Sequence, residues 1–216
     1  MLTLPSGLSS RYTTSETIEL MYMTYAGLAN KKIVESLQKN NVDAIGLSGI
    51  DGKLIIGKRH PALISQENDK RIVVKVDLTG SVESINLDLL NRFLGHGLLP
   101  VITPPVITEK GEVINVDGDK IASKIATEMK AKTLLFLIEA PGIMTDLEDK
   151  NSLVKKVNKG NLEELLVIVS GRMKRKLMEC IKLLDCGIER IIIADGRIES
   201  PISNALNGGG TQIYES

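Results

Sequence analysis

One apolar run constrains the fold of this chain more than any other feature. Residues 132–138 read Lys-Thr-Leu-Leu-Phe-Leu-Ile, which is a nearly continuous apolar segment of strand length. Such a run is typical of a central parallel strand, because a strand with one exposed face would alternate polar and apolar residues. Pro141 and Gly142 follow shortly afterwards and predict a loop at the carboxyl edge of a sheet.

Segments of strand length alternate with helical patterns along the rest of the chain. Strands are expected at residues 42–47, 53–56, 71–76, 98–102 and 191–194, and helices at 13–39, 86–94, from 119, at 174–184 and at 201–206. Turns are expected at Asp51-Gly52, as a hairpin between two strands, at Thr79-Gly80 and at residues 208–211. This order predicts an α/β protein, a three-layer αβα sandwich around a mostly parallel central sheet.

The composition argues against several classes of function. Twenty-seven basic residues balance 27 acidic ones and aromatic residues make up 3%, so no surface for nucleic acid or anionic lipid is expected. Cys180 and Cys186 have no second cysteine pair, so we expect reduced thiols rather than a zinc site. No apolar run approaches the roughly 20 residues of a membrane span, and residues 1–5 do not resemble a signal peptide. A soluble, cytoplasmic protein is therefore expected.

The first long helix, expected over residues 13–39, is apolar over more than one face. Thr13 followed by Glu16 forms a capping-box pattern at its start. Apolar residues then recur at helical spacing, and further apolar residues widen the stripe. Such a helix is either buried in a large core or shared with a second subunit. We expect a subunit contact, and hence a dimer or a larger homo-oligomer.

Residues 114–126 combine a strand end, a loop and the start of an amphipathic helix. Asp117 or Asp119 is expected to accept hydrogen bonds from the first free amides of the helix. A strand, a loop and a helix N-terminus together suit a phosphate or a carboxylate-bearing ligand. The alternative is that Asn115 and Asp117 only build a turn and a cap.

Other candidate residues also have structural explanations when taken singly. Arg11 fits a solvated loop cation, Lys174–Lys176 an exposed helix face, and Gly142 and Gly171 ordinary turns. Their order along the chain is more informative. The motifs are, in order, residues 7–13, 46–52 (Gly-Leu-Ser-Gly-Ile-Asp-Gly), 115–119 (Asn-Val-Asp-Gly-Asp), 141–143 (Pro-Gly-Ile) and 170–176 (Ser-Gly-Arg-Met-Lys-Arg-Lys).

In this order the motifs resemble those of the amino acid kinase family, specifically the acetylglutamate and acetylaminoadipate kinases. The resemblance covers nearly the whole chain. The Ser10-Arg11-Tyr12-Thr13 segment is similar to that of members whose substrate is tethered to a small amino-group carrier protein. The resemblance implies transfer of the ATP γ-phosphoryl group to a side-chain carboxylate in arginine or lysine biosynthesis. Other amino acid kinases, acting on carbamate, glutamate or a nucleoside monophosphate, are the alternative enzymes.

The resemblance also implies roles for individual residues. Arg11 would bind the other carboxylate of the substrate, and Asn115 would hydrogen-bond the substrate. Asp119 would orient the cationic groups around the transferred phosphoryl, and Lys176 would neutralise the charge that develops on the phosphates. The nucleotide, with Mg²⁺ carried on its phosphates, would be held by Glu139, Pro141, Gly142, Ile143, Ser170, Gly171 and Met173. Residues of about 1–105 would form the lobe for acyl-amino-acid binding and dimerisation, and about 106–216 the nucleotide-binding lobe.

The chain departs from the family pattern at its start. Family members begin with a strand that ends in a lysine–glycine–glycine motif, followed by a glycine-rich turn, and neither precedes Arg11 here. Those elements supply a second catalytic lysine and backbone donors, so their loss is expected to reduce turnover strongly. Two interpretations follow: an N-terminally truncated sequence that starts at an internal methionine, or a shortened, catalytically weak nucleotide-binding subunit.

Overall fold

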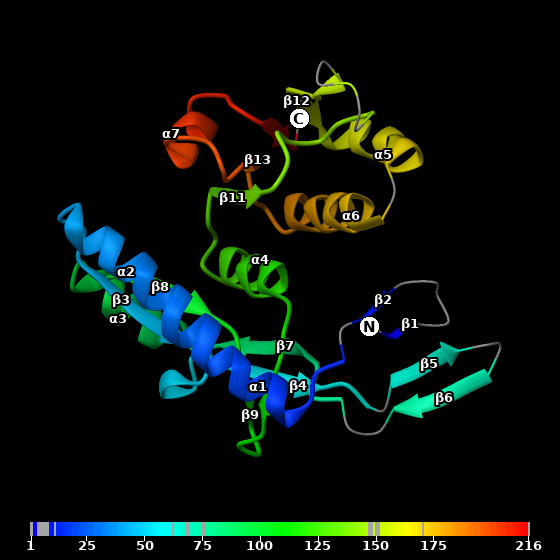
Figure 1. The fold of residues 1–216 in the computed structure, drawn as a ribbon. Helices are drawn as coiled ribbons and strands as arrows, with labels where there is room; N and C mark the ends of the chain where they lie inside the picture. Colours follow the sequence, from blue (N-terminus) through cyan, green and yellow to red (C-terminus); the bar gives the residue numbers. More distant parts are fainter. Residues whose placement is uncertain are drawn as a thin grey trace. The chain divides into compact units, whose positions relative to one another are not determined.

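The computed structural model describes residues 2–3, 9–10, 12–61, 63–67, 70–74, 77–146, 149, 152–169 and 171–215. The chain forms two compact units, Met1–Lys124 and Ile125–Ser216, whose elements are drawn in Figure 1. The division falls inside helix α4 (Gly118–Glu128). The assignment of substrate binding to residues of about 1–105 and of nucleotide binding to about 106–216 stays a prediction.

The first unit begins with a long helix of three contiguous parts. These are α1 (Ser15–Met21), the π-helical segment η1 (Tyr22–Ala29) and α2 (Asn30–Lys39). The helix confirms the sequence-based prediction, but the predicted cap is wrong by one residue: the hydroxyl of Thr14 accepts from the backbone N–H of Thr17 at 3.3 Å. The π winding has no signature in the hydrophobic pattern and was not predicted.

Helix α2 packs on a pair of parallel strands, β3 (Ala44–Ser48) and β8 (Leu99–Thr103). The strands are in register from Ala44 opposite Leu99 to Ser48 opposite Thr103. The side-chain amide of Asn30, which is buried, donates to the carbonyl of Leu47 at 3.3 Å and to that of Val101 at 2.8 Å. One residue of the helix is thus bonded to both strands. Helix α3 (Leu87–Gly95), whose N-cap is Asn86, also packs on β8.

A second sheet of the first unit has the order β10-β9-β4-β7. Its strands are β4 (Ile55–Arg59), β7 (Gly80–Ile85), β9 (Val106–Thr108) and β10 (Val113–Ile114). The hairpin expected at Asp51-Gly52 is wrong, because β3 and β4 pair with different strands and Asp51–Lys53 forms a 3₁₀ turn (η2). The turn expected at Thr79-Gly80 is also wrong, since Thr79 forms a β-bridge with Asn115 and Gly80 begins β7.

Two small antiparallel pairs complete the described strands of this unit. They are β1 (Leu2–Thr3) with β2 (Ser9–Ser10), and β5 (Leu63–Glu67) with β6 (Lys70–Val74).

The second unit contains a four-stranded sheet with the order β11-β13-β14-β12. Its strands are β11 (Thr133–Ile138), β13 (Arg190–Asp195), β14 (Thr211–Tyr214) and β12 (Lys156–Asn158). Its helices are α5 (Lys159–Ile168), α6 (Gly171–Asp185) and α7 (Pro201–Leu206). The core is formed by fully buried aliphatic residues of β13 together with apolar side chains of α5 and α6.

The predicted α/β class is confirmed, and the sheets combine parallel with antiparallel pairs. Strand β11 pairs in parallel with β13, as expected from its continuous apolar character, but it stands at the end of the described strand order rather than at its centre. Strand β14 was missed: a terminal turn was expected near Gly208–Thr211, whereas Thr211 begins a strand antiparallel to β13. In the part of the chain that the structure describes, no helix combines the length and apolar character of a membrane-spanning segment.

Candidate active site

Asn115 is held firmly at the end of β10. Its backbone N–H donates to the carbonyl of Leu78 at 2.7 Å, and its carbonyl accepts from Gly80 N–H at 2.9 Å. Its side-chain Nδ2 donates to Oγ1 of Thr13 at 3.2 Å. The amide that was expected to bind substrate therefore lies beside the segment that follows Arg11, with Thr13 two positions further along the chain.

Asp77 is a buried carboxylate that the sequence-based prediction missed. It accepts a hydrogen bond from the backbone N–H of Thr13 at 2.9 Å and another from the hydroxyl of Thr79. A buried carboxylate needs such donors, because an unpaired charge in the interior is very unfavourable. Asp77 thereby fixes the backbone at Thr13. Its partner is 64 residues away in the sequence, so no local pattern could reveal the pairing.

Arg59 supports the same region from the neighbouring strand. Its Nε donates to the backbone carbonyl of Asp77 at 2.9 Å, and its guanidinium forms an ion pair with Glu112. Arg59 thus connects β4 with the segment that precedes β7 and with the loop between β9 and β10. Three chain segments meet around Asn115 and Thr13 as a result.

Asp117 and Asp119 have different roles at the start of α4. Oδ1 of Asp117 accepts from the backbone N–H of Asp119 at 2.9 Å, and its carbonyl accepts from Ile121 N–H at 3.1 Å. Asp117 is therefore the capping residue of the two that were considered. Asp119 is exposed in the first turn, where a negative charge is favourable. The role predicted for Asp119 near a phosphoryl group stays a prediction.

The loop after β11 is anchored against β14. Backbone N–H of Ile143, which is buried, donates to Oγ1 of Thr211 at 2.8 Å. A Cβ at Gly142 would approach that same oxygen to 2.5 Å, so only glycine fits there without movement. Glu139 and Pro141 are exposed on the loop. The loop thus has a fixed inner half and an accessible outer half.

A second turn, after β13, joins the same edge of the sheet. Gly196 N–H donates to the carbonyl of Ile138 at 2.9 Å, which ties the ends of β11 and β13 together. Arg197 donates to both carboxylate oxygens of Asp195, from Nε at 2.9 Å and from Nη2 at 2.8 Å. These bonds lower the pKa of Asp195 to about 2, and they raise the pKa of Arg197. The Asp-Gly-Arg sequence at the end of β13 is the local signal for this turn, and sequence reasoning missed it.

Lys176 and Gly171 belong to α6. Gly171 begins the helix with a φ of +59°, a conformation that glycine adopts readily. Lys176 is half-buried, and its Nζ lies 4.1 Å from the centroid of the Phe136 ring on β11. Its neighbours Lys174 and Arg175 are exposed, as is usual for a basic cluster. Met173 is half-buried.

The described residues among the predicted site residues are divided between the two units. Asn115 and Asp119 lie in the first unit, and Glu139, Pro141, Gly142, Ile143, Gly171, Met173 and Lys176 lie in the second. Arg11 and Ser170 are outside the described residues. The convergence of all these residues on one crevice stays a prediction. Among the described residues, no group of three histidine, cysteine or acidic side chains is placed to hold a metal ion.

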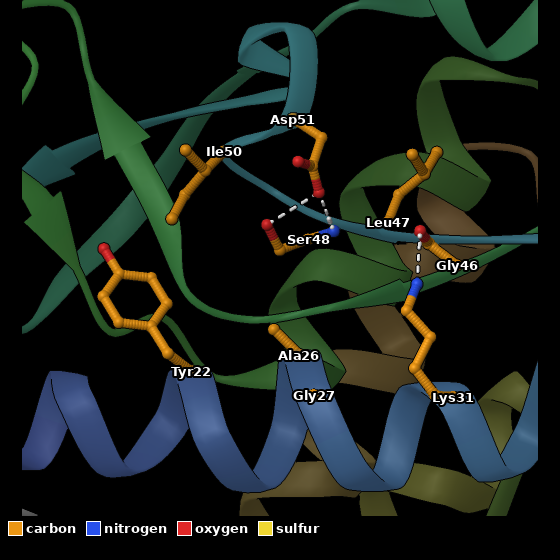
Figure 2. Close-up of a pocket in the computed structure, with 9 residues that line it drawn as sticks. All are labelled: Tyr22, Ala26, Gly27, Lys31, Gly46, Leu47, Ser48, Ile50 and Asp51. Carbon is orange, nitrogen blue, oxygen red and sulfur yellow. Dashed lines mark hydrogen bonds between the residues drawn. The ribbon is translucent and has the colours of Figure 1, made fainter.

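A hollow of about 480 Å³ lies in the first unit between the π-helical segment and the end of β3 (Figure 2). Lys31 Nζ donates to the carbonyl of Gly46 at 3.2 Å on one side. On the other side Oδ2 of Asp51 accepts from the backbone and the hydroxyl of Ser48, at 2.6 and 2.9 Å. The charged groups on the rim are thus already engaged within the unit.

Two solved structures illustrate the fold. N-acetylglutamate synthase from Neisseria gonorrhoeae, solved with coenzyme A and N-acetyl-glutamate, superposes with a TM-score of 0.81 at 17% identity, over 100% of this chain and 47% of that chain. Carbamate kinase from Giardia superposes with a TM-score of 0.63 at 15% identity, over 92% of this chain and 72% of that chain. At these identities the likeness defines the fold alone.

Sequence comparison defines the family. The profile described as "Amino acid kinase family" matches residues 1–195, and the chain belongs to that family. It is 44% identical to the [LysW]-aminoadipate kinase of Thermus thermophilus, over 98% of this chain and 80% of that protein. It is 34% identical to a putative [LysW]-aminoadipate/[LysW]-glutamate kinase of Nitrosopumilus maritimus, over 99% of this chain and 79% of that protein. Acetylglutamate kinase of Brachyspira hyodysenteriae is 32% identical, over 87% of this chain and 62% of that protein. The predicted family is confirmed.

Proposed function

We propose that this protein transfers the γ-phosphoryl group of ATP to the side-chain carboxylate of an aminoadipate or glutamate attached to the carrier protein LysW. The product is an acyl phosphate, an intermediate of lysine or arginine biosynthesis. The observation that carries the proposal is the 44% identity to a [LysW]-aminoadipate kinase over 98% of the chain. The reaction takes place in the cytoplasm, where ATP is available.

The chemistry of this reaction suits the residues of the first unit. A carboxylate nucleophile has a reference pKa near 4, so it is already ionised at neutral pH and needs no general base. It needs positioning instead. Asn115, fixed by three hydrogen bonds, presents an amide beside the segment after Arg11. Arg11 then binds the second carboxylate of the amino acid with its planar guanidinium, a geometry that lysine cannot reproduce.

The second unit supplies the groups expected to bind the nucleotide. The loop of Glu139–Ile143 has exposed outer residues above a buried anchor, which suits a ligand at the carboxyl edge of β11. Lys176 neutralises charge on the phosphates, and Asp119, a residue of the first unit, is expected to orient the surrounding cations. Mg²⁺ arrives on the phosphates of ATP, because this ion keeps much of its water shell and is usually bound through substrate phosphates and one or two carboxylates.

Acyl phosphate formation tests the proposal directly. The purified protein is incubated with MgATP, hydroxylamine and one acceptor at a time: LysW-linked aminoadipate, LysW-linked glutamate, free acetylglutamate, free acetylaminoadipate or carbamate. Hydroxylamine traps an acyl phosphate as a hydroxamate. We expect hydroxamate with the LysW-linked acceptors. Turnover only with carbamate or a free acetylated amino acid would contradict the carrier-linked substrate. ATP binding without turnover on any acceptor would instead identify a non-catalytic subunit.

We also propose that the protein forms a two-fold dimer through the long helix of residues 15–39. Large apolar side chains along its middle are exposed, namely Leu20, Tyr22, Met23, Tyr25, Leu28 and Ile33. Acidic Glu16 and Glu19 precede this stretch, and basic Lys31 and Lys32 follow it. An antiparallel second copy would therefore place acids opposite bases around a centre near Tyr25. This self-complementary charge pattern is what an isologous interface requires.

Charge reversal tests the dimer. Glu19→Lys and Lys32→Glu are each expected to weaken association, because each creates like-charge pairs across the axis. The double variant restores opposite charges and is expected to restore the dimer. Molar mass from light scattering during gel filtration measures the effect. A dimer that persists in both single variants, or a monomer in the unchanged protein, would contradict this interface.

A further inference from the structure

The geometry points to Phe136 as the positioning residue for Lys176: the face of its ring holds the lysine ammonium near the carboxyl end of β11. This inference rests on the proposed kinase function and assigns a role to a residue that no motif includes. Nζ of Lys176 lies 4.1 Å from the ring centroid, well inside the about 6 Å over which an ammonium is attracted to an aromatic face.

The ring is itself a fixed platform. Phe136 is 6% exposed and belongs to the core of the second unit, together with Leu177 and Cys180 of α6. It lies in β11 directly opposite Ile193 of β13, whose side chain is fully buried. A ring packed in this way has little room to move. The ammonium above it therefore has a defined place.

The position along the strand gives this contact its significance. Phe136 stands two residues before Ile138, the last residue of β11, and the Glu139–Ile143 loop follows. The ammonium is therefore close to the edge where the nucleotide is proposed to bind. A lysine side chain has four rotatable carbon–carbon bonds and loses considerable entropy when it is fixed. A partner that fixes it beforehand lowers the cost of placing a cation against developing negative charge.

The neighbouring basic residues provide an internal comparison. Lys174 and Arg175 are exposed, whereas Lys176 is half-buried against the ring. Lys176 thus differs from its two basic neighbours in being half-buried against an aromatic ring of β11. The alternative is that Phe136 only fills the core and that its contact with Lys176 has no influence on the reaction.

Fluorination of the ring separates these two possibilities. Fluorine withdraws the negative charge from the ring face and so weakens the attraction to a cation, with little change of size. The chain contains two phenylalanines, Phe93 and Phe136, so in a Phe93→Leu background biosynthetic labelling alters only the ring of interest. We expect kcat to fall stepwise from mono- to trifluorophenylalanine, by about fivefold in total, with the KM for ATP little changed. Phe136→Leu should fall at least as far, and Phe136→Tyr should retain most of the activity.

A second readout does not depend on turnover. The ε-methylene protons of Lys176, assigned by their loss in Lys176→Arg, are expected to resonate upfield from those of the other lysines because of the ring current. They are expected to return to ordinary values in Phe136→Leu. An ordinary shift in the unchanged protein overturns the contact. A normal upfield shift with kcat insensitive to fluorination overturns the positioning role while the kinase function stands. An upfield shift in a protein that phosphorylates no acceptor refutes the kinase function and leaves only a packing contact.

Discussion

Nδ2 of Asn115 donates a hydrogen bond of 3.2 Å to Oγ1 of Thr13, a residue 102 positions earlier in the chain. The backbone of Thr13 is held in turn by the buried carboxylate of Asp77. The motif of residues 7–13, which contains Arg11, is therefore joined directly to Asn115, and the family resemblance assigns both Arg11 and Asn115 to substrate binding. This pairing gives a physical basis for assigning the acceptor site to the first unit.

Removal of the Asn115 amide is expected to weaken acceptor binding. Asn115→Ala loses a hydrogen bond to a charged ligand, and the KM for LysW-linked aminoadipate should rise about tenfold. The KM for ATP should hardly change. Asn86→Ala, which removes only the cap of α3, is the matched control and should leave both KM values as they are. An unchanged acceptor KM in Asn115→Ala would contradict the assignment.

Truncation of Asp77 is expected to destabilise the fold. Asp77→Ala leaves the buried N–H of Thr13 and the hydroxyl of Thr79 without their acceptor, at a cost of about 1–3 kcal/mol in the free energy of unfolding. Urea denaturation measures the change. Asp88→Ala removes an exposed pair with Arg92 and should change stability by less than about 1 kcal/mol. Equal effects of the two substitutions would show that Asp77 is not a structural anchor.

Lys176→Ala is expected to reduce kcat by about 10²–10³-fold, because one preorganised charge stabilising the transition state is lost. The circular dichroism spectrum should not change. Lys174→Ala is the control, since Lys174 is an exposed lysine of the same helix. Normal turnover of Lys176→Ala in the hydroxamate assay would show that the role assigned to this lysine is wrong.

Substitutions of Asp117 and Asp119, the two aspartates at the start of α4, should have different effects on activity and on stability. Asp119→Asn is expected to lower kcat steeply with a loss of stability below about 1 kcal/mol, since Asp119 does not cap the helix and supplies only an exposed charge in its first turn. Asp117→Asn keeps a side-chain oxygen for the cap, and Asp117→Ala should cost about 0.5–2 kcal/mol of stability with kcat largely retained. Thermal unfolding and turnover are measured on all three variants. The opposite pattern, with activity lost only at Asp117, would exchange the two roles.

The Asp195–Arg197 pair predicts a specific acid response. The pKa of Asp195 is about 2 in the folded protein, below its ordinary value of 3.8, because Arg197 donates to the carboxylate. Its contribution to stability is therefore complete above about pH 4 and is lost as the pH falls from there towards 2. Titration of the Asp195 carboxyl carbon by NMR should show the low midpoint, and Arg197→Gln should move it up towards 3.8. A midpoint near 3.8 in the unchanged protein would contradict the pair.

Local sequence patterns predicted the helices and strands better than they predicted which strands pair with one another. The strand at residues 132–138, the long helix that ends near Lys39 and the short helix at residues 86–94 all follow from local sequence patterns, and the structure confirms them. The prediction of a hairpin at Asp51-Gly52 was wrong, because each flanking strand pairs with a strand far away in the sequence. Strand β14 was missed because its four residues follow three consecutive glycines.

In the candidate site, too, local motifs were predictable from the sequence, whereas long-range contacts were not. The order of the motifs led to Asn115, Asp119, Lys176 and the Glu139–Ile143 loop, and the family that this order predicted is confirmed. Asp77 and Phe136 were not predicted, because each acts through a contact between residues separated by tens of positions. A buried carboxylate or an aromatic core residue has no local signature of its partner. Such positions become visible only when the chain is folded.

The amide of Asn30 has a consequence for how the first unit opens. A single nitrogen is bonded to carbonyls on two adjacent strands, so neither strand can slide along the other without leaving a polar group unsatisfied in the interior. The helix likewise cannot peel away from the strands alone. We therefore expect helix α2, β3 and β8 to open together rather than separately, with amide protons that exchange with deuterium at a common rate.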